Sequence, residues 1–141
     1  MVIPAAKKIT ERFKIPWQVI VAQAVLETGW GRYISKDRTT GRDSKNLFNI
    51  KGKGPAGSVE VLTTEYYGGR PRKVVDRFRA YNTYEESFED HAALLTQNKR
   101  YAPCMEVVDD PEEFARRLQA CGYATDPKYA AKLISIMKRF A

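Results

Sequence analysis

Apolar side chains recur every three or four residues in several stretches of this chain, and this spacing is typical of amphipathic helices. Ile9 and Phe13 lie four residues apart and predict a first helix over about residues 3–13. A second helix is predicted from Pro16, which suits a first helical turn, to about Thr28, where glycines end the pattern. Two helices joined by a short turn therefore open the chain.

Helix-start signals mark further helices in the second half of the chain. Thr83 and Glu86 have the spacing of a capping box, and they predict a helix to about Gln97. Asp–Pro pairs at 110–111 and 126–127 combine a capping carboxylate with a residue suited to the first turn. Each pair therefore predicts the start of another helix.

The period of the apolar positions changes to two between residues 58 and 81, which is the spacing of a strand. Gly68 and Gly69 predict the turn of a β-hairpin, with the second strand over about residues 73–81. The pattern as a whole predicts a single α+β domain over residues 1–141, mostly helical, with one small hairpin. One face of the first strand carries Val59, Val61, Thr63 and Glu65.

Charge narrows the class of protein. The 24 Lys and Arg residues exceed the 17 Asp and Glu residues and give a formal net charge of +7. A basic surface attracts polyanions such as nucleic acid, anionic membranes or cell-wall polymers, although a scattered excess is also typical of an ordinary solvated surface. Because the cations form no clustered basic helix, we expect no nucleic-acid binding.

The sequence shows no segment for membrane insertion or export. No apolar run approaches the length of a membrane span, and the first residues lack the apolar core of a signal peptide. Cys104 and Cys121 make neither a disulfide framework nor a metal-ligand spacing, and the single histidine, His91, cannot form a histidine metal cluster. We therefore expect two small buried thiols, no metal and no cofactor.

Two glutamates are the candidates for catalysis. Glu27 is the first charge after the apolar run of the second predicted helix. A carboxyl group there should be partly desolvated, which raises its pKa and suits a general acid. Glycosidic hydrolysis usually needs a second carboxyl group, and Glu65 on the hairpin is the candidate. A glutamate on a hairpin is also an ordinary edge residue, so spacing alone leaves both interpretations of Glu65 open.

Six segments carry a resemblance to a known family. They are AQAVLETGWGRY, NLFNIKG, TTEYYGG, FRAYNTYEESFEDHAALL, NKRY and GYATDPKYAAKL, and they cover most of the chain from about residue 18 to 137. In this order they resemble the glucosaminidase domain of glycoside hydrolase family 73. The resemblance implies a lysozyme-like fold with a cleft between a helical lobe and a small β-hairpin lobe. It also implies that Glu27 is the general acid and that Glu65, in TTEY, is the second catalytic group.

Residues that bind the substrate are implied as well. Tyr123, in GYATDP, matches a cleft tyrosine of the family, and Asp90 matches another of its acidic positions. We add Tyr81, an aromatic residue close to the motifs, because sugar faces pack on aromatic rings. We add Asn46 for substrate or loop positioning.

Two aromatic residues and two departures from the family complete the site. Trp30 and Phe48 are expected to pack around the acid and help to raise its pKa. His91 stands where related sequences often have an aromatic residue, and Asn49 replaces a common glycine. Neither departure is expected to touch the acid.

The resemblance implies a peptidoglycan hydrolase, an endo-β-N-acetylglucosaminidase that cleaves the β-1,4 bond after N-acetylglucosamine. A muramidase or lytic transglycosylase on the same scaffold and a non-catalytic wall-binding module remain the alternatives. Inverting, retaining and substrate-assisted mechanisms all stay open. The expected partner is the peptidoglycan glycan strand, bound by a monomer without membrane insertion, in the cell wall or periplasm.

Overall fold

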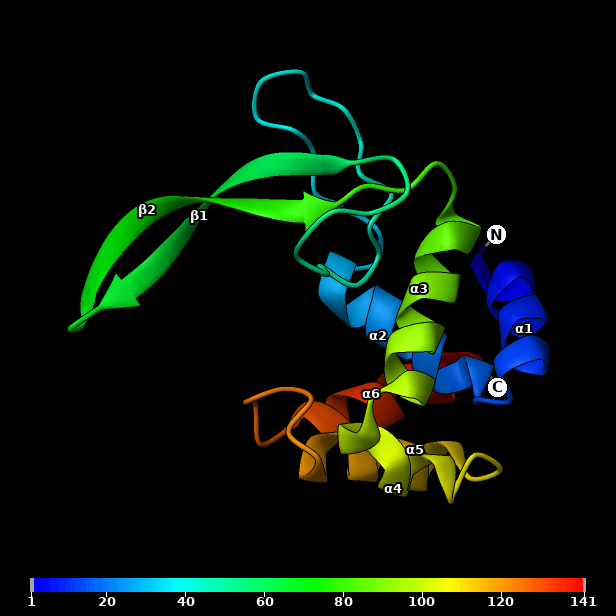
Figure 1. The fold of residues 1–141 in the computed structure, drawn as a ribbon. Coiled ribbons are helices and arrows are strands. Elements are labelled where there is room, and N and C mark those ends of the chain that lie inside the picture. Colours follow the sequence, from blue (N-terminus) through cyan, green and yellow to red (C-terminus); the bar gives the residue numbers. More distant parts are fainter. Residues whose placement is uncertain (1, 141) are drawn as a thin grey trace.

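The computed structural model describes residues 2–140, and Figure 1 shows a body of packed helices from which one long β-hairpin projects. The predicted helices and the hairpin are all present. The elements are α1 (Val2–Phe13), α2 (Trp17–Thr28), β1 (Ser58–Tyr67), β2 (Arg70–Arg79), α3 (Tyr84–Gln97), α4 (Ala102–Met105), α5 (Pro111–Ala120) and α6 (Tyr129–Met137), with short 3-10 helices at Lys99–Tyr101 and Lys138–Phe140.

Helix α2 runs through the helical body, and α1, α5 and α6 all pack against it. Because neighbours cover it on several sides, residues 19–24 are all buried and the helix has no solvent-facing stripe in its middle. Gly29 ends it in the left-handed conformation, with φ 57°, and its N–H binds the carbonyl of Val25. Glu27 therefore lies in the last turn, as the sequence predicts.

The predicted caps of two helices are confirmed. The Thr83 hydroxyl accepts a hydrogen bond from the Glu86 N–H at 3.1 Å, and the Asp110 carboxylate accepts one from the Glu113 N–H at 3.1 Å. The third start was placed too early. The Asp126 carboxylate accepts from the Lys128 N–H at 2.9 Å and closes a turn, so that α6 begins only at Tyr129.

The hydrophobic pattern does not predict two short elements between α3 and α5. The 3-10 helix Lys99–Tyr101 leads directly into the four-residue helix α4. Elements of this length contain about one helical turn, so they show no repeated apolar spacing. Their position is fixed by packing instead, because Tyr101 and Cys104 are both buried in the main core.

The β-hairpin is antiparallel, and its second strand begins at Arg70, three residues earlier than predicted. Gly68 and Gly69 form the turn with φ values of 57° and 79°, a conformation that suits a tight hairpin. Near the body, Val59 pairs with Phe78, and both are buried with Ala80 in a small core of their own. Beyond that core the ribbon is largely exposed.

A long loop joins α2 to the hairpin, and residues 50–52 of this loop pair with β2. The Gly52 N–H donates to the Arg77 carbonyl at 3.0 Å, and the Arg79 N–H donates to the Ile50 carbonyl at 2.9 Å. The loop is therefore anchored to the hairpin at one end and to the end of α2 at the other. None of the helices within residues 2–140 is long and apolar enough to cross a membrane.

Candidate active site

The Glu27 carboxyl group is half-buried in the last turn of α2. Burial among apolar neighbours raises the pKa of Glu27, because it disfavours the charged form. The end of a helix has partial negative charge, which also disfavours a carboxylate there. A carboxyl group in such a position keeps its proton at a higher pH than an exposed glutamate does, which is what a general acid requires.

Asn49 is the direct hydrogen-bond partner of this acid. Its side-chain amide donates to Glu27 Oε2 at 3.3 Å and to the Glu27 carbonyl at 3.2 Å. The expectation that this departure from the family does not touch the acid is therefore wrong. Asn49 has a φ of 53°, a left-handed conformation that asparagine tolerates better than most residues. Its hydrogen bond lowers the pKa of Glu27 and partly offsets the effect of burial.

Tyr123 belongs to a stack of aromatic rings beside the acid. Its ring stacks on Tyr129, with centroids 5.5 Å apart, and lies 5.8 Å from the Tyr101 ring. Burial raises the pKa of Tyr123, and the nearby charge of Glu27 raises it further. Tyr123 therefore shares its electrostatic surroundings with Glu27, and its role in binding substrate stays a prediction.

A buried polar chain lies beneath this aromatic stack. The Gln23 amide nitrogen donates to the Tyr129 hydroxyl at 3.0 Å, and the Gln23 amide oxygen lies 2.8 Å from His91 Nε2. With the amide in this orientation, its oxygen accepts a hydrogen bond from a protonated Nε2. Burial lowers the pKa of His91 to about 3, so the imidazole is neutral at physiological pH. His91 is thus a structural residue.

The two residues expected to pack around the acid differ in burial. Phe48 is buried and stacks on His91 with centroids 3.9 Å apart, and its packing against Glu27 stays a prediction. Trp30 is not part of the packed core, because it is 51% exposed and the Arg139 guanidinium lies over its ring at 5.2 Å. Trp30 follows the helix-ending glycine with a φ of 63°, and the chain there has already turned away from the core.

Glu65 lies near the tip of the hairpin, in a cluster separate from that of Glu27. The Lys51 ammonium is 3.8 Å from Glu65 Oε1 and 3.3 Å from Asp76 Oδ2. The Tyr67 hydroxyl donates to Glu65 at 3.1 Å. Within residues 2–140 no hydrogen bond or ion pair joins Glu65 to Glu27. The short loop segment from Asn49 to Lys51 connects the two clusters.

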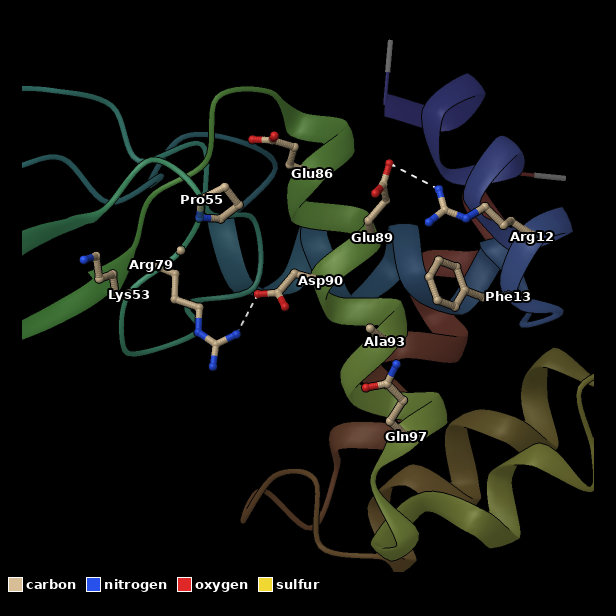
Figure 2. Close-up of a pocket in the computed structure, with 11 residues that line it drawn as sticks. Arg12, Phe13, Lys53, Pro55, Arg79, Glu86, Glu89, Asp90, Ala93 and Gln97 are labelled. Carbon is tan, nitrogen blue, oxygen red and sulfur yellow. Dashed lines mark hydrogen bonds and ion pairs between the residues drawn. The ribbon is translucent and has the colours of Figure 1, made fainter.

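Asp90 and Tyr81 form a third cluster. Asp90 accepts hydrogen bonds from the Arg79 guanidinium at 2.8 Å and from the Tyr81 hydroxyl at 2.5 Å. Figure 2 shows Asp90 on α3 joined directly to Arg79. Both residues line a cavity of about 580 Å³. Glu27 does not line this cavity, which is bordered by α1, α3 and the 53–55 segment.

Two of the predicted substrate contacts therefore need correction. Tyr81 is only 2% exposed and its hydroxyl is bound to Asp90, so it offers no surface to a sugar. Asn46 is fully buried, and its amide donates to the carbonyls of Ile50 and Arg79. Asn46 therefore positions the loop, which is one of the two roles predicted for it, and it has no exposed surface for substrate. Asp90 is partly exposed, and its role in binding stays a prediction.

Three contributors to these clusters are not among the predicted site residues. Gln23 looks like one polar residue within an apolar helix, and Asp76 looks like an ordinary strand charge. Lys51 lies only two residues from Asn49 in the NLFNIKG segment, and this spacing was the one available signal. Their partners are distant in the chain, so only the fold brings them together.

A helical body with a desolvated carboxyl group, beside a hairpin that presents further carboxylates, has the lysozyme-like fold of glycoside hydrolases. The chain belongs to the glucosaminidase family, described as mannosyl-glycoprotein endo-beta-N-acetylglucosaminidase, which it matches over residues 3–141. The predicted family and fold class are thereby confirmed.

Similar proteins and structures agree with this assignment. The peptidoglycan hydrolase FlgJ of Pseudomonas aeruginosa is 42% identical over 139 residues, which are 97% of this chain and 34% of that protein. The exo-glucosaminidase LytG of Bacillus subtilis is 33% identical over 96% of this chain and 48% of its own length. The chain thus spans between a third and a half of these relatives.

Solved structures show the same fold. A C-terminally truncated glycoside hydrolase domain of FlgJ from Salmonella typhimurium has a TM-score of 0.81 at 40% identity and covers 98% of this chain and 91% of its own. The catalytic domain of the autolysin Auto from Listeria monocytogenes has a TM-score of 0.82 at 28% identity, over 99% of this chain and 80% of its own.

Proposed function

We propose that this chain is a peptidoglycan hydrolase domain, an endo-β-N-acetylglucosaminidase that cleaves the β-1,4 bond after N-acetylglucosamine. The observation that carries the proposal is the Glu27 carboxyl group, half-buried at the end of α2 with a raised pKa. The names of the relatives support the substrate class, since FlgJ is named a peptidoglycan hydrolase and LytG an exo-glucosaminidase.

In the proposed reaction the protonated Glu27 gives its proton to the oxygen of the glycosidic bond as that bond breaks. The sugar that remains carries positive charge at its anomeric carbon, and water or a nucleophile must attack that carbon. Glu65 is the proposed second group. At about 6.5–9.5 Å from the acid it would activate water with inversion, and at about 5–5.5 Å it would act as a nucleophile with retention. If the substrate's own acetamido group attacks, Glu65 orients or stabilises it.

The net charge of +7 fits a substrate with acidic peptides and anionic polymers. We infer a single domain over residues 1–141 that acts as a monomer on glycan strands of the cell wall or periplasm. Neither nucleic acid nor a metal or cofactor enters the proposed reaction, because two carboxyl groups supply the acid and the base.

The test is the clearing of purified cell walls by Glu27→Gln. Gln cannot donate the proton, so turnover should fall about 10²–10⁴-fold, the contribution of a general acid. Binding to the walls should be retained. Glu11→Gln is the matched control, because Glu11 is an exposed glutamate of α1. Mass spectrometry of the products should show new reducing N-acetylglucosamine ends.

Other results would select the alternatives. Clearing by Glu27→Gln at the rate of Glu11→Gln would remove Glu27 as the acid. New reducing N-acetylmuramic acid ends would identify a muramidase, and anhydro sugars a lytic transglycosylase. Wall binding without any turnover by the unmodified chain would identify a binding module.

A further inference from the structure

On the face of the hairpin that carries Val59 and Phe78, two carboxyl groups lie near one ammonium group. Glu65 on β1 and Asp76 on β2 both contact Lys51, at 3.8 Å and 3.3 Å. The Thr63 hydroxyl donates to Asp76 at 2.9 Å. The Thr63 bond and then the Lys51 ammonium hold the pKa of Asp76 below its ordinary value. Asp76 therefore stays ionised, and Lys51 contacts two carboxyl groups of the hairpin.

The backbone of Lys51 is fixed from both sides. Lys51 forms an antiparallel bridge with Phe78. Residues paired in this way point to the same face of a sheet, so the Lys51 side chain shares the face of Phe78 and Asp76. The Lys51 carbonyl also accepts a hydrogen bond from Arg79 Nε at 3.1 Å. The Lys51 side chain thus extends along the ribbon from a backbone that is held by hydrogen bonds.

The same loop holds the acid two residues earlier. Asn49 donates to Glu27, while Lys51 contacts Glu65. The residue that contacts Glu27 and the residue that contacts Glu65 are therefore joined by this three-residue segment. Any change in the orientation of the ribbon relative to the segment changes the position of Glu65 relative to Glu27.

We propose that Lys51 is a positioning residue, which orients Glu65 and the distal hairpin with respect to the acid. This inference rests on the function proposed above. Lys51 does not react with the substrate. Its ammonium attracts the two hairpin carboxylates and so favours the ribbon conformations in which Glu65 faces the loop of the acid.

The exposure of these ion pairs determines the kind of effect to expect. The Lys51 side chain is 60% exposed and that of Glu65 is 39% exposed. Exposed ion pairs are weak and are screened by salt, so Lys51 adds little to the stability of the fold. A weak contact is enough to bias an exposed ribbon, and it can break and reform as glycan enters and leaves.

The test combines Lys51→Met with Glu65→Gln in steady-state assays on soluble glycan oligomers. We expect Lys51→Met to lower kcat about tenfold, with a smaller change in KM and an unchanged Tm. In the Glu65→Gln background the same change should alter kcat less than about twofold, because Lys51 acts through Glu65. Lys51→Arg should restore most of the activity.

The matched control is Lys53→Met, which removes the same charge from the same loop. Lys53 is exposed and lines the cavity of Asp90. Equal activity of Lys51→Met and Lys53→Met would overturn the inference, and so would an equal loss of kcat in both Glu65 backgrounds. These outcomes are separate from the proposed function, which fails only if Glu27→Gln retains turnover or the products differ.

Discussion

Glu27 and Glu65 are held in opposite ways. Glu27 lies at the end of a helix packed among α1, α5 and α6, beside buried rings and a buried polar chain. Glu65 lies on a two-stranded ribbon beyond the small core of Val59 and Phe78, and its contacts are exposed. Burial therefore sets the protonation of the first carboxyl group, whereas weak polar contacts set the position of the second.

This difference matters for the proposed pair of catalytic carboxyl groups. An acid needs a raised pKa, which a close-packed core provides because it excludes water. A base or nucleophile must instead reach the substrate, which a carboxyl group on an exposed ribbon can do. The two halves of the site thus carry separate physical requirements.

The largest expected effect sharpens the role of the ribbon. Glu65→Gln should lower kcat by about 10²-fold, at the lower end of what acid–base groups contribute. Glu60→Gln is the control on the opposite face of the same strand, where Glu60 pairs with Arg77. Kinetics on defined glycan oligomers measure both. Equal activity of the two variants would mean that the ribbon supplies no catalytic group.

The next prediction tests the buried polar chain beside Glu27. His91→Phe keeps a ring against Phe48 but leaves the Gln23 oxygen without its partner, which should cost about 1–3 kcal/mol of unfolding free energy at pH 7. The folded pKa of about 3 lies below the ordinary value of 6.5, so the stability that depends on neutral His91 is present above 6.5 and lost as pH falls toward 3. The gap between variant and wild type should therefore shrink as pH falls. Denaturant titrations at several pH values measure it, and a constant gap would contradict the assignment.

A smaller effect separates the third cluster from the other two. Tyr81→Phe removes the hydroxyl that binds Asp90 and should reduce stability by about 1 kcal/mol. Hydrolysis should change less than twofold, because the Tyr81 side chain offers no surface to a substrate. Thermal unfolding and wall clearing measure the two quantities. A large loss of activity at unchanged stability would restore Tyr81 to the site.

The smallest effect concerns the partner of the acid. Asn49→Gly removes a hydrogen bond that lowers the pKa of Glu27, so that pKa should rise further. Because the acid form is the active one, the alkaline limb of the pH–rate profile should move to higher pH. Glycine is unstrained at a φ of 53°, so the fold should be unchanged. A limb that stays fixed or moves to lower pH would show that Asn49 does not tune the acid.

Local patterns predicted most of the fold. The helix that ends after Glu27, the Thr83 and Asp110 caps and the Gly68–Gly69 turn are all set by residues within four positions of one another. The partial burial of Glu27 was predictable for the same reason, since it follows from the apolar run before it. The exposure of Trp30 and the presence of α4 were not predictable, because both depend on packing against distant segments.

The contacts around the site were harder to predict. Asn49 binds a residue 22 positions away, and Gln23 binds His91 68 positions away. Asn46 and Tyr81 have side chains typical of sugar-binding sites, yet both are bound to groups of the protein itself. Residue type alone does not show whether a polar side chain faces solvent or is hydrogen-bonded inside the protein. The hydrogen-bond partners of Asn46 and Tyr81 are therefore known only from the structure.

The small core at the base of the hairpin has a consequence for how this scaffold can vary. Apolar burial on the ribbon stops near the pair of Val59 and Phe78, so residues nearer the turn contribute little to folding. Inserting one residue pair in each strand turns over the faces, whereas inserting two pairs preserves their alternation. The length of the ribbon is therefore adjustable in steps of two residue pairs, and the helical body stays unaltered. Changes of length in this family should be tolerated in the ribbon before they are tolerated in the helices.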